Sequence, residues 1–155
     1  MLKILLIEDD EEKSRVISDF IMDEFPYFEL DVARSFNSGL RLAIKGNSYY
    51  TCLLLDMSMP NFDVTADIPT GDNPESFAGI DLLSQMKIRR INIPTIVVTM
   101  FDKFGNETNS MSLDELIKKL ETEYTPIFRG LTHYNLAEDG WRTSLKKQIS
   151  EILNK

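Results

Sequence analysis

The sequence predicts a doubly wound α/β fold, in which five parallel strands form one sheet with helices on both faces. Short apolar runs, each bounded by polar residues, alternate along the chain with segments of helical periodicity. Strands that alternate with helices pair in parallel through right-handed crossovers. The length of 155 residues suits one domain with one core. We therefore expect a single domain over residues 1–155.

Five apolar runs have the length and composition of strands. The first and third are almost continuously apolar, as strands buried on both faces are. The second alternates apolar and polar residues, which is typical of an edge strand. The expected strands cover residues 2–7, 28–33, 50–55, 94–98 and 127–133.

Helices are expected between and after these strands. The first begins among acids, which suit the positive end of a helix dipole. Gly46 is expected to end the second, and Ser112 with Glu115 forms a capping-box pattern that opens the fourth. Apolar residues at helical spacing place the five helices near residues 16–21, 40–44, 80–88, 112–124 and 141–149. Two polar segments, 61–78 and 101–111, are expected to be long loops.

Composition disfavours several classes of function. The net charge of −8 argues against a surface that binds DNA or RNA. No apolar run approaches the roughly 18 residues that span a bilayer, and the N-terminus lacks the longer apolar region of a signal peptide. We therefore expect a cytoplasmic protein that binds neither nucleic acid nor membrane directly. The one cysteine, Cys52, lies in an apolar run and is expected in the core.

Acidic and hydroxyl side chains follow three of the expected strands. Glu8 and Asp9 follow the first, Asp56 follows the third and Thr99 follows the fourth. Ligands of open α/β sheets collect at the carboxyl ends of the strands, so all four side chains are expected at one rim. Crowded carboxylates raise one another's pKa, and Mg²⁺, which prefers oxygen ligands, removes this conflict. An Asp56 oxygen can then attack a phosphoryl donor, and the Thr99 hydroxyl can form a hydrogen bond with the phosphoryl group.

The same residues have plainer interpretations. Acids after the first strand can simply favour the next helix terminus. Asp56 can be a turn residue before Ser58 and Pro60. Their common placement at one rim, in this order, favours a site over these separate explanations.

Four segments occur in the order and spacing of a known family: Lys3–Asp10, Leu53–Pro60, Gly79–Leu83 and Ile93–Thr99. With them the chain resembles the receiver domain of bacterial two-component response regulators, in an atypical stand-alone form. The resemblance implies the (βα)5 flavodoxin-like receiver fold and a signalling protein that is not an enzyme. It also implies phosphorylation by a histidine kinase or phosphotransfer protein. Output through a protein partner is expected, because the sequence ends with the fifth helix.

The resemblance also implies roles for individual residues. By position, Asp56 is the phosphoacceptor and Thr99 is the switching hydroxyl. Asp9 is a direct Mg²⁺ ligand, and Glu8 acts through metal-bound water. Ser58 contributes its backbone carbonyl to the same metal site, beside Asp56.

The chain departs from the family pattern on its last strand. Tyr134 and Asn135 stand where the family has Lys-Pro, and a tyrosine provides a hydrogen bond instead of a permanent charge. His133 and Arg129 are candidate replacement cations. Leu131 stands at the family's aromatic switch position.

Two further departures lie nearer the acids. Met100 follows Thr99 where the family has a small residue. The segment between Pro60 and Gly79 is longer than in the family, and we expect an inserted loop at about 61–78. It is a lid, a partner-binding loop or a segment without a role.

These departures keep a second function open, that of a pseudo-receiver that binds partners without phosphorylation. The missing lysine and Leu131 favour this alternative. The intact Glu8, Asp9, Asp56 and Thr99 oppose it. Mg²⁺ binding separates the two. A third function, an Mg²⁺-dependent phosphohydrolase, is disfavoured because Ser58 stands where such enzymes need a general acid.

Overall fold

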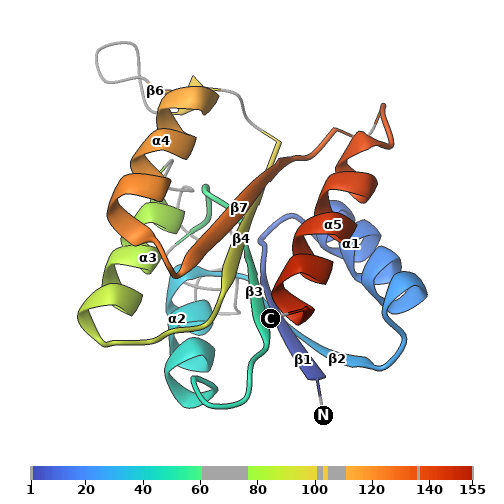
Figure 1. The fold of residues 1–155 in the computed structure, drawn as a ribbon, viewed down its shortest axis with the longest axis horizontal. Helices are drawn as coiled ribbons and strands as arrows, with labels where there is room; N and C mark the ends of the chain where they lie inside the picture. The colour runs from blue at the N-terminus through green and yellow to red at the C-terminus, as the bar shows by residue number, and fades with distance from the viewer. Residues whose placement is uncertain (1, 61–76, 101–102, 105–110, 136, 155) are drawn as a thin grey trace, which may run out of the picture.

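The computed structural model describes residues 2–60, 77–100, 103–104, 111–135 and 137–154. Their main feature is one five-stranded parallel sheet with the order β2-β1-β3-β4-β7 (Figure 1). The alternating strand is at the edge, as predicted. The five strands are β1 (Leu2–Ile7), β2 (Phe28–Ala33), β3 (Cys52–Leu55), β4 (Thr95–Thr99) and β7 (Phe128–His133).

Helices cover both faces of this sheet, which confirms the predicted doubly wound fold. One face carries α1 and α5, and the other carries α2, α3 and α4 (Figure 1). Each helix lies where helical periodicity predicted one, with ends that differ by a few residues. The bounds are α1 (Glu11–Glu24), α2 (Phe36–Lys45), α3 (Ala78–Ile88), α4 (Leu113–Tyr124) and α5 (Gly140–Leu153). None of these helices is long and apolar enough to cross a membrane.

Side-chain caps fix where three of the helices begin. Asp10 accepts a hydrogen bond from the Lys13 backbone N–H at 2.9 Å and so starts α1 directly after β1. Ser35 caps α2 in a complete capping box. Ser112 accepts from the Glu115 N–H at 3.2 Å, which confirms the predicted start of α4. These bonds satisfy backbone donors that have no partner within the helix.

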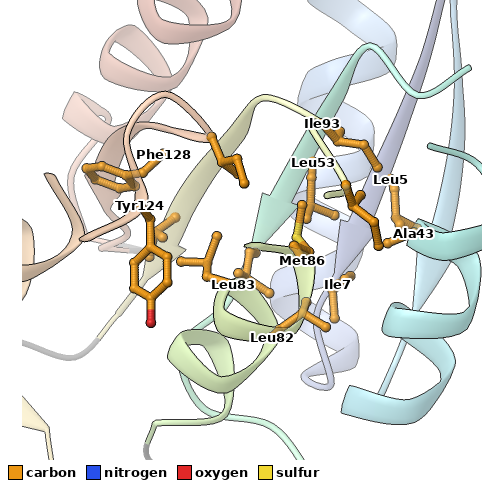
Figure 2. Close-up of a cluster of buried hydrophobic side chains, with 14 of the residues drawn as sticks. Leu5, Ile7, Ala43, Leu53, Leu82, Leu83, Met86, Ile93, Tyr124 and Phe128 are labelled. Atoms are coloured by element: carbon orange, nitrogen blue, oxygen red, sulfur yellow. The ribbon is translucent and has the colours of Figure 1, made fainter. Parts of the chain in front are cut away.

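Two hydrophobic cores lie on the two faces of the sheet. Because side chains alternate along a strand, Leu5 and Ile7 of β1 pack against α2 and α3, while Ile4 and Leu6 pack toward α1 and α5. Figure 2 shows the first of these cores. Cys52 is fully buried in the second, as predicted. The two cores hold the strand ends, and thus the site, in fixed positions.

The structure corrects both predicted loops in part. Within 101–111, β5 (Lys103–Phe104) pairs antiparallel with β6 (Met111–Ser112). A strand of two residues carries no periodicity, so the sequence did not reveal it. At the end of the predicted 61–78 insertion, Phe77 is the N-cap of α3 and Ala78 is a buried helical residue. Residues 61–76 lie outside the described part of the chain.

Candidate phosphoacceptor site

Three carboxylates meet at the carboxyl ends of β1 and β3. These neighbouring strands flank the point where the strand order reverses, which is where open α/β sheets bind ligands. One oxygen each from Glu8, Asp9 and Asp56 lies within 4.8 Å of the others. Hard oxygen ligands at this spacing suit Mg²⁺. The structure therefore brings together the three acids that the sequence placed at one rim.

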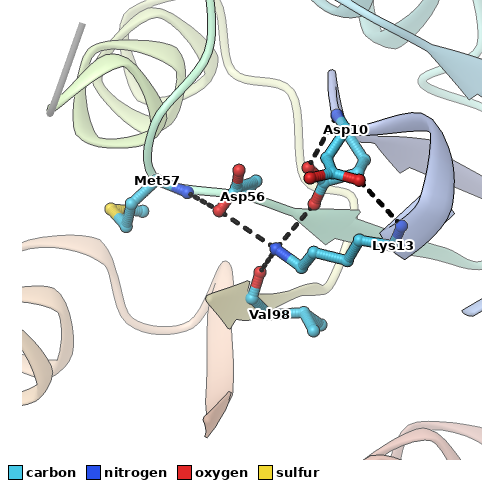
Figure 3. A network of polar contacts seen from close by, with 6 residues as sticks. Asp10, Lys13, Asp56, Met57 and Val98 are labelled. Carbon is cyan, nitrogen blue, oxygen red and sulfur yellow. Dashed lines mark hydrogen bonds and ion pairs between the residues drawn. The ribbon is translucent and has the colours of Figure 1, made fainter. Parts of the chain in front are cut away.

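Asp56 is held in a fixed orientation. Its backbone N–H donates to the Ile7 carbonyl at 3.1 Å, which extends the β1–β3 pairing by one residue. Its Oδ1 accepts from the Met57 N–H at 2.9 Å and lies 3.3 Å from the Lys13 Nζ. Figure 3 shows the second carboxylate oxygen pointing away from both donors. The contacts of Oδ1 thus orient the carboxylate, and its second oxygen is turned away from Met57 and Lys13.

Lys13 is a site residue that sequence reasoning missed. Its side chain is only 2% exposed, and its Nζ lies 2.6 Å from Glu8 Oε2. The same ammonium donates to the Val98 carbonyl at the end of β4 at 2.9 Å (Figure 3). A helical signal was present, because Lys13 lies four residues before the buried Ile17 and seven before the buried Phe20, on the same face of α1.

The electrostatics of this cluster leave an excess of negative charge. Burial and the charge of Asp56 raise the pKa of Glu8 to about 8, although Lys13 opposes this. Burial also raises the pKa of Asp56 and, together with the Asp56 charge, that of Asp9. Burial acts to lower the pKa of Lys13, but Asp56 and Glu8 outweigh it and raise that pKa. One ammonium therefore faces three carboxyl groups, and a divalent cation would relieve the remaining conflict.

A pocket opens above these groups. Its volume is about 140 Å³, which is room for several water molecules at about 30 Å³ each. Its lining residues are Glu8, Asp9, Asp10, Lys13, Asp56, Ser58 and Met100. The pocket thus has space beside the carboxylates for a hydrated ion or a small anionic group.

Comparisons with known proteins agree with this geometry. No family model matches the chain. The chain is 30% identical over 151 residues to the Detocs response regulatory protein DtcB of Enterobacter cloacae, covering 97% of this chain and 100% of that protein. The chain belongs to the response-regulator receiver family. Members are signalling modules of two-component systems and generally not enzymes, which confirms the predicted class of function.

Solved receivers share the fold at low sequence identity. A receiver domain protein from Clostridium thermocellum matches with a TM-score of 0.67 and 19% identity, covering 99% of this chain and 95% of that one. The CheX-CheY-BeF3-Mg²⁺ complex from Borrelia burgdorferi matches with a TM-score of 0.67 and 15% identity, covering 99% and 90%. These likenesses confirm the predicted receiver fold.

The last strand shows how this receiver differs from the family pattern. Tyr134, in the place of the family's lysine, is 1% exposed, and its N–H donates to the Thr99 carbonyl at 2.7 Å. Neither suggested replacement cation lies in the site. His133 is exposed, and Arg129 donates its Nε to the Pro126 carbonyl at the other end of β7. The positive charge in the site comes from Lys13 of α1.

The remaining predicted residues lie around the pocket or beside it. Ser58 and Met100 line it, and Met100 is 37% exposed. Thr99 is the last residue of β4 and is fully buried. Leu131 is half-buried against the core that contains α3 and α4. The switching role of Thr99 and the metal role of the Ser58 carbonyl stay predictions.

Proposed function

We propose that this receiver is a phosphorylation switch in which Asp56 accepts a phosphoryl group from a histidine kinase or phosphotransfer protein. The observation that carries the proposal is the cluster of Glu8, Asp9 and Asp56 oxygens within 4.8 Å, with Asp56 oriented through its Oδ1. Phosphorylation needs such a carboxylate at a pocket open to a donor. The pocket beside Asp56 meets that requirement.

The chemistry is a displacement at phosphorus. The Asp56 oxygen turned away from Met57 and Lys13 forms an O–P bond while the P–N bond to the donor's histidine breaks. The electron pair of that bond stays on the imidazole, which takes up a proton. Asp56 is the nucleophile, and its fixed orientation reduces the entropy lost on reaching the reactive geometry. The Thr99 hydroxyl is the proposed hydrogen-bond donor to the phosphoryl group.

The carboxylates fit Mg²⁺ in number, charge and spacing. Asp9 and Asp56 would hold the ion directly, Glu8 through water, and Ser58 through its carbonyl. When bound, the ion neutralises charge that develops on the phosphoryl oxygens. In the receiver complex from Borrelia burgdorferi, Mg²⁺ and BeF3 are present together. That precedent supports Mg²⁺ as the cofactor here.

The proposed output is through a protein partner, in the cytoplasm and without direct contact to nucleic acid or membrane. Within the proposed single receiver domain of residues 1–155, the phosphoryl group would change the affinity of the face formed by β4, α4 and β7. The receiver from Borrelia burgdorferi is in complex with another protein, CheX. Residues 61–76 of the predicted insertion lie outside the described structure, so its role as a lid, a partner-binding loop or a segment without a role stays a prediction.

A second candidate is a pseudo-receiver that binds partners without phosphorylation, and Lys13 favours it. The crowding of carboxylates argues for a metal, but the Lys13 ammonium, 2.6 Å from Glu8 and 3.3 Å from Asp56, already neutralises part of their charge. One positive charge does not balance three carboxylates, so the phosphorylation switch remains the better supported function.

Mg²⁺ titration by calorimetry at pH 8 tests the choice. We expect binding at millimolar Mg²⁺, weakened about tenfold or more by Asp9→Asn because a ligand is lost. Asp19→Asn removes the same charge from the exposed side of α1, where the Asp19 side chain is 68% exposed, and should leave the affinity unchanged. If the wild-type protein shows no binding at millimolar Mg²⁺, the pseudo-receiver is the better description.

A further inference from the structure

We infer that Lys13 of α1 supplies the positive charge that binds the phosphoryl group, in the place of the lysine that receivers carry on their last strand. This inference rests on the proposed phosphorylation of Asp56. Tyr134 stands in the usual place of the lysine. Lys13 instead brings an ammonium to the Asp56 carboxylate from α1, near the N-terminal end of the chain.

The position of Lys13 is fixed before any ligand binds. Asp10 caps its backbone N–H at 2.9 Å, so the residue lies in the first turn of α1. An ammonium has three donors, and Lys13 directs its own to Glu8, Asp56 and the Val98 carbonyl. The contacts with Glu8 and Val98, at 2.6 and 2.9 Å, are the shorter ones. They can hold Nζ while the longer contact with Asp56, at 3.3 Å, passes to a phosphoryl oxygen.

Tyr134 explains why Lys13 can adopt this position. Its ring centroid lies 5.7 Å from Lys13 Nζ, within the range of a cation–π contact. Its hydroxyl is buried without a hydrogen-bond partner among the described residues, so the side chain serves here as an aromatic wall. A lysine in that place would bring a second ammonium toward the first. Tyrosine at 134 and lysine at 13 are therefore compatible with each other, and two lysines would repel.

A plainer role for Lys13 is a structural counterion for Glu8. That role predicts a loss of stability on substitution, with no specific effect on phosphoryl binding. The phosphoryl-binding role and the counterion role give different predictions when the lysine is moved from position 13 to position 134, after the last strand. A lysine at 134 returns the cation to the position that the family uses and toward the place of the Lys13 Nζ, which lies 5.7 Å from the Tyr134 ring, but it does not restore the Glu8–Lys13 ion pair.

The test compares four proteins: wild type, Lys13→Met, Lys13→Met with Tyr134→Lys, and Lys119→Met. Methionine keeps the unbranched shape of lysine, and Lys119→Met is a matched control that removes a paired lysine from α4. The first readout is the affinity for beryllofluoride in the presence of Mg²⁺. Titration calorimetry measures this affinity in all four proteins, including the double variant that lacks the Tyr134 ring. The second readout is the rate of mass gain with acetyl phosphate.

We expect Lys13→Met to lower the beryllofluoride affinity and the phosphorylation rate by about 10²-fold, as the loss of one preorganised electrostatic group does. The double variant should regain most of both, and Lys119→Met should match wild type. Circular dichroism checks the fold of each protein.

Two results would overturn the inference. One is a folded Lys13→Met protein within twofold of wild type, which leaves Lys13 as a counterion only. The other is a folded double variant that gains neither affinity nor rate, and this second result decides the matter even if Lys13→Met alone does not fold. A wild-type protein that binds no beryllofluoride and gains no mass instead refutes the proposed function itself.

Discussion

At the scale of single residues, Glu8 shows how burial and charge oppose each other in the site. It is 1% exposed, directly after β1, and its Oε1 also accepts from the Asp10 N–H at 3.2 Å. Burial and the Asp56 charge raise its pKa from 4.5 to about 8. Between about pH 4.5 and about pH 8 the folded protein without metal therefore takes up a proton at Glu8 more readily than the unfolded chain does, and metal binding opposes that uptake.

This shift predicts how pH changes the effect of Mg²⁺. A carboxyl whose pKa is raised in the folded state stabilises the fold at low pH, and that contribution is lost as pH rises from about 4.5 to about 8. Mg²⁺ replaces the lost proton. We therefore expect Mg²⁺ to raise the melting temperature more at pH 8 than at pH 6. Differential scanning fluorimetry at both pH values measures this.

The isosteric variant Glu8→Gln is the control for that experiment, because an amide has no proton to lose. Its response to Mg²⁺ should be weaker and should differ less between the two pH values than the response of the wild-type protein. An equal response of the wild-type protein at pH 6 and pH 8 would contradict the assignment of the raised pKa to Glu8.

At the scale of elements, the first turn of α3 packs directly against the backbone of Asp56 and Met57. Gly79, in the first turn of α3, donates its N–H to the Met57 carbonyl at 2.9 Å. A Cβ at Gly79 would lie 2.7 Å from the Asp56 carbonyl oxygen and 2.9 Å from the Met57 Cα. Both contacts are with backbone atoms, which cannot move aside as a side chain can. Therefore α3 can approach Asp56 and Met57 this closely only when residue 79 is glycine.

We predict that Gly79→Ala destabilises the protein by about 1–3 kcal/mol, the usual cost of overpacking, and slows phosphorylation of Asp56. Urea unfolding measures the first effect and mass gain with acetyl phosphate the second. Gly140→Ala in the first turn of α5 is the matched control, because a Cβ there meets nothing within 4 Å. It should change stability by less than about 0.5 kcal/mol. Equal behaviour of the two variants would show that the close approach at Gly79 is unimportant.

The elements also show what sequence patterns can and cannot predict. The helices were predictable because burial of one face imposes a period of 3.6 residues, and the edge strand β2 because its side chains alternate. The central strands were predictable because a strand buried on both faces is a continuous apolar run. The acids were predictable as a group because parallel strands end at one rim. Lys13 was not predicted, since a charged residue among the acids of a first helical turn is usually solvated. Only its spacing to Ile17 and Phe20 indicated the buried face.

At the scale of the whole molecule, Lys13 joins three parts of the fold at the site. It extends from α1, binds the end of β4 through the Val98 carbonyl, and lies beside Tyr134, which follows β7. Tyr134 in turn contacts Trp141 of α5, with ring centroids 4.9 Å apart. A phosphoryl group on Asp56 would compete for the Lys13 ammonium and so act on the helical layer formed by α1 and α5 and on the end of β4. No pattern along the chain specifies such a meeting of distant segments.

The most direct test of the central claim is the intact mass of the protein after incubation with acetyl phosphate, with and without Mg²⁺, compared with Asp56→Asn. We predict a gain of about 80 Da, the mass of one phosphoryl group on a carboxylate nucleophile, that requires both Mg²⁺ and Asp56. A folded wild-type protein that gains no mass with acetyl phosphate or with histidine-phosphorylated donor proteins would contradict the account. A gain that persists in Asp56→Asn would contradict it equally, because the phosphoryl group would then lie on another residue.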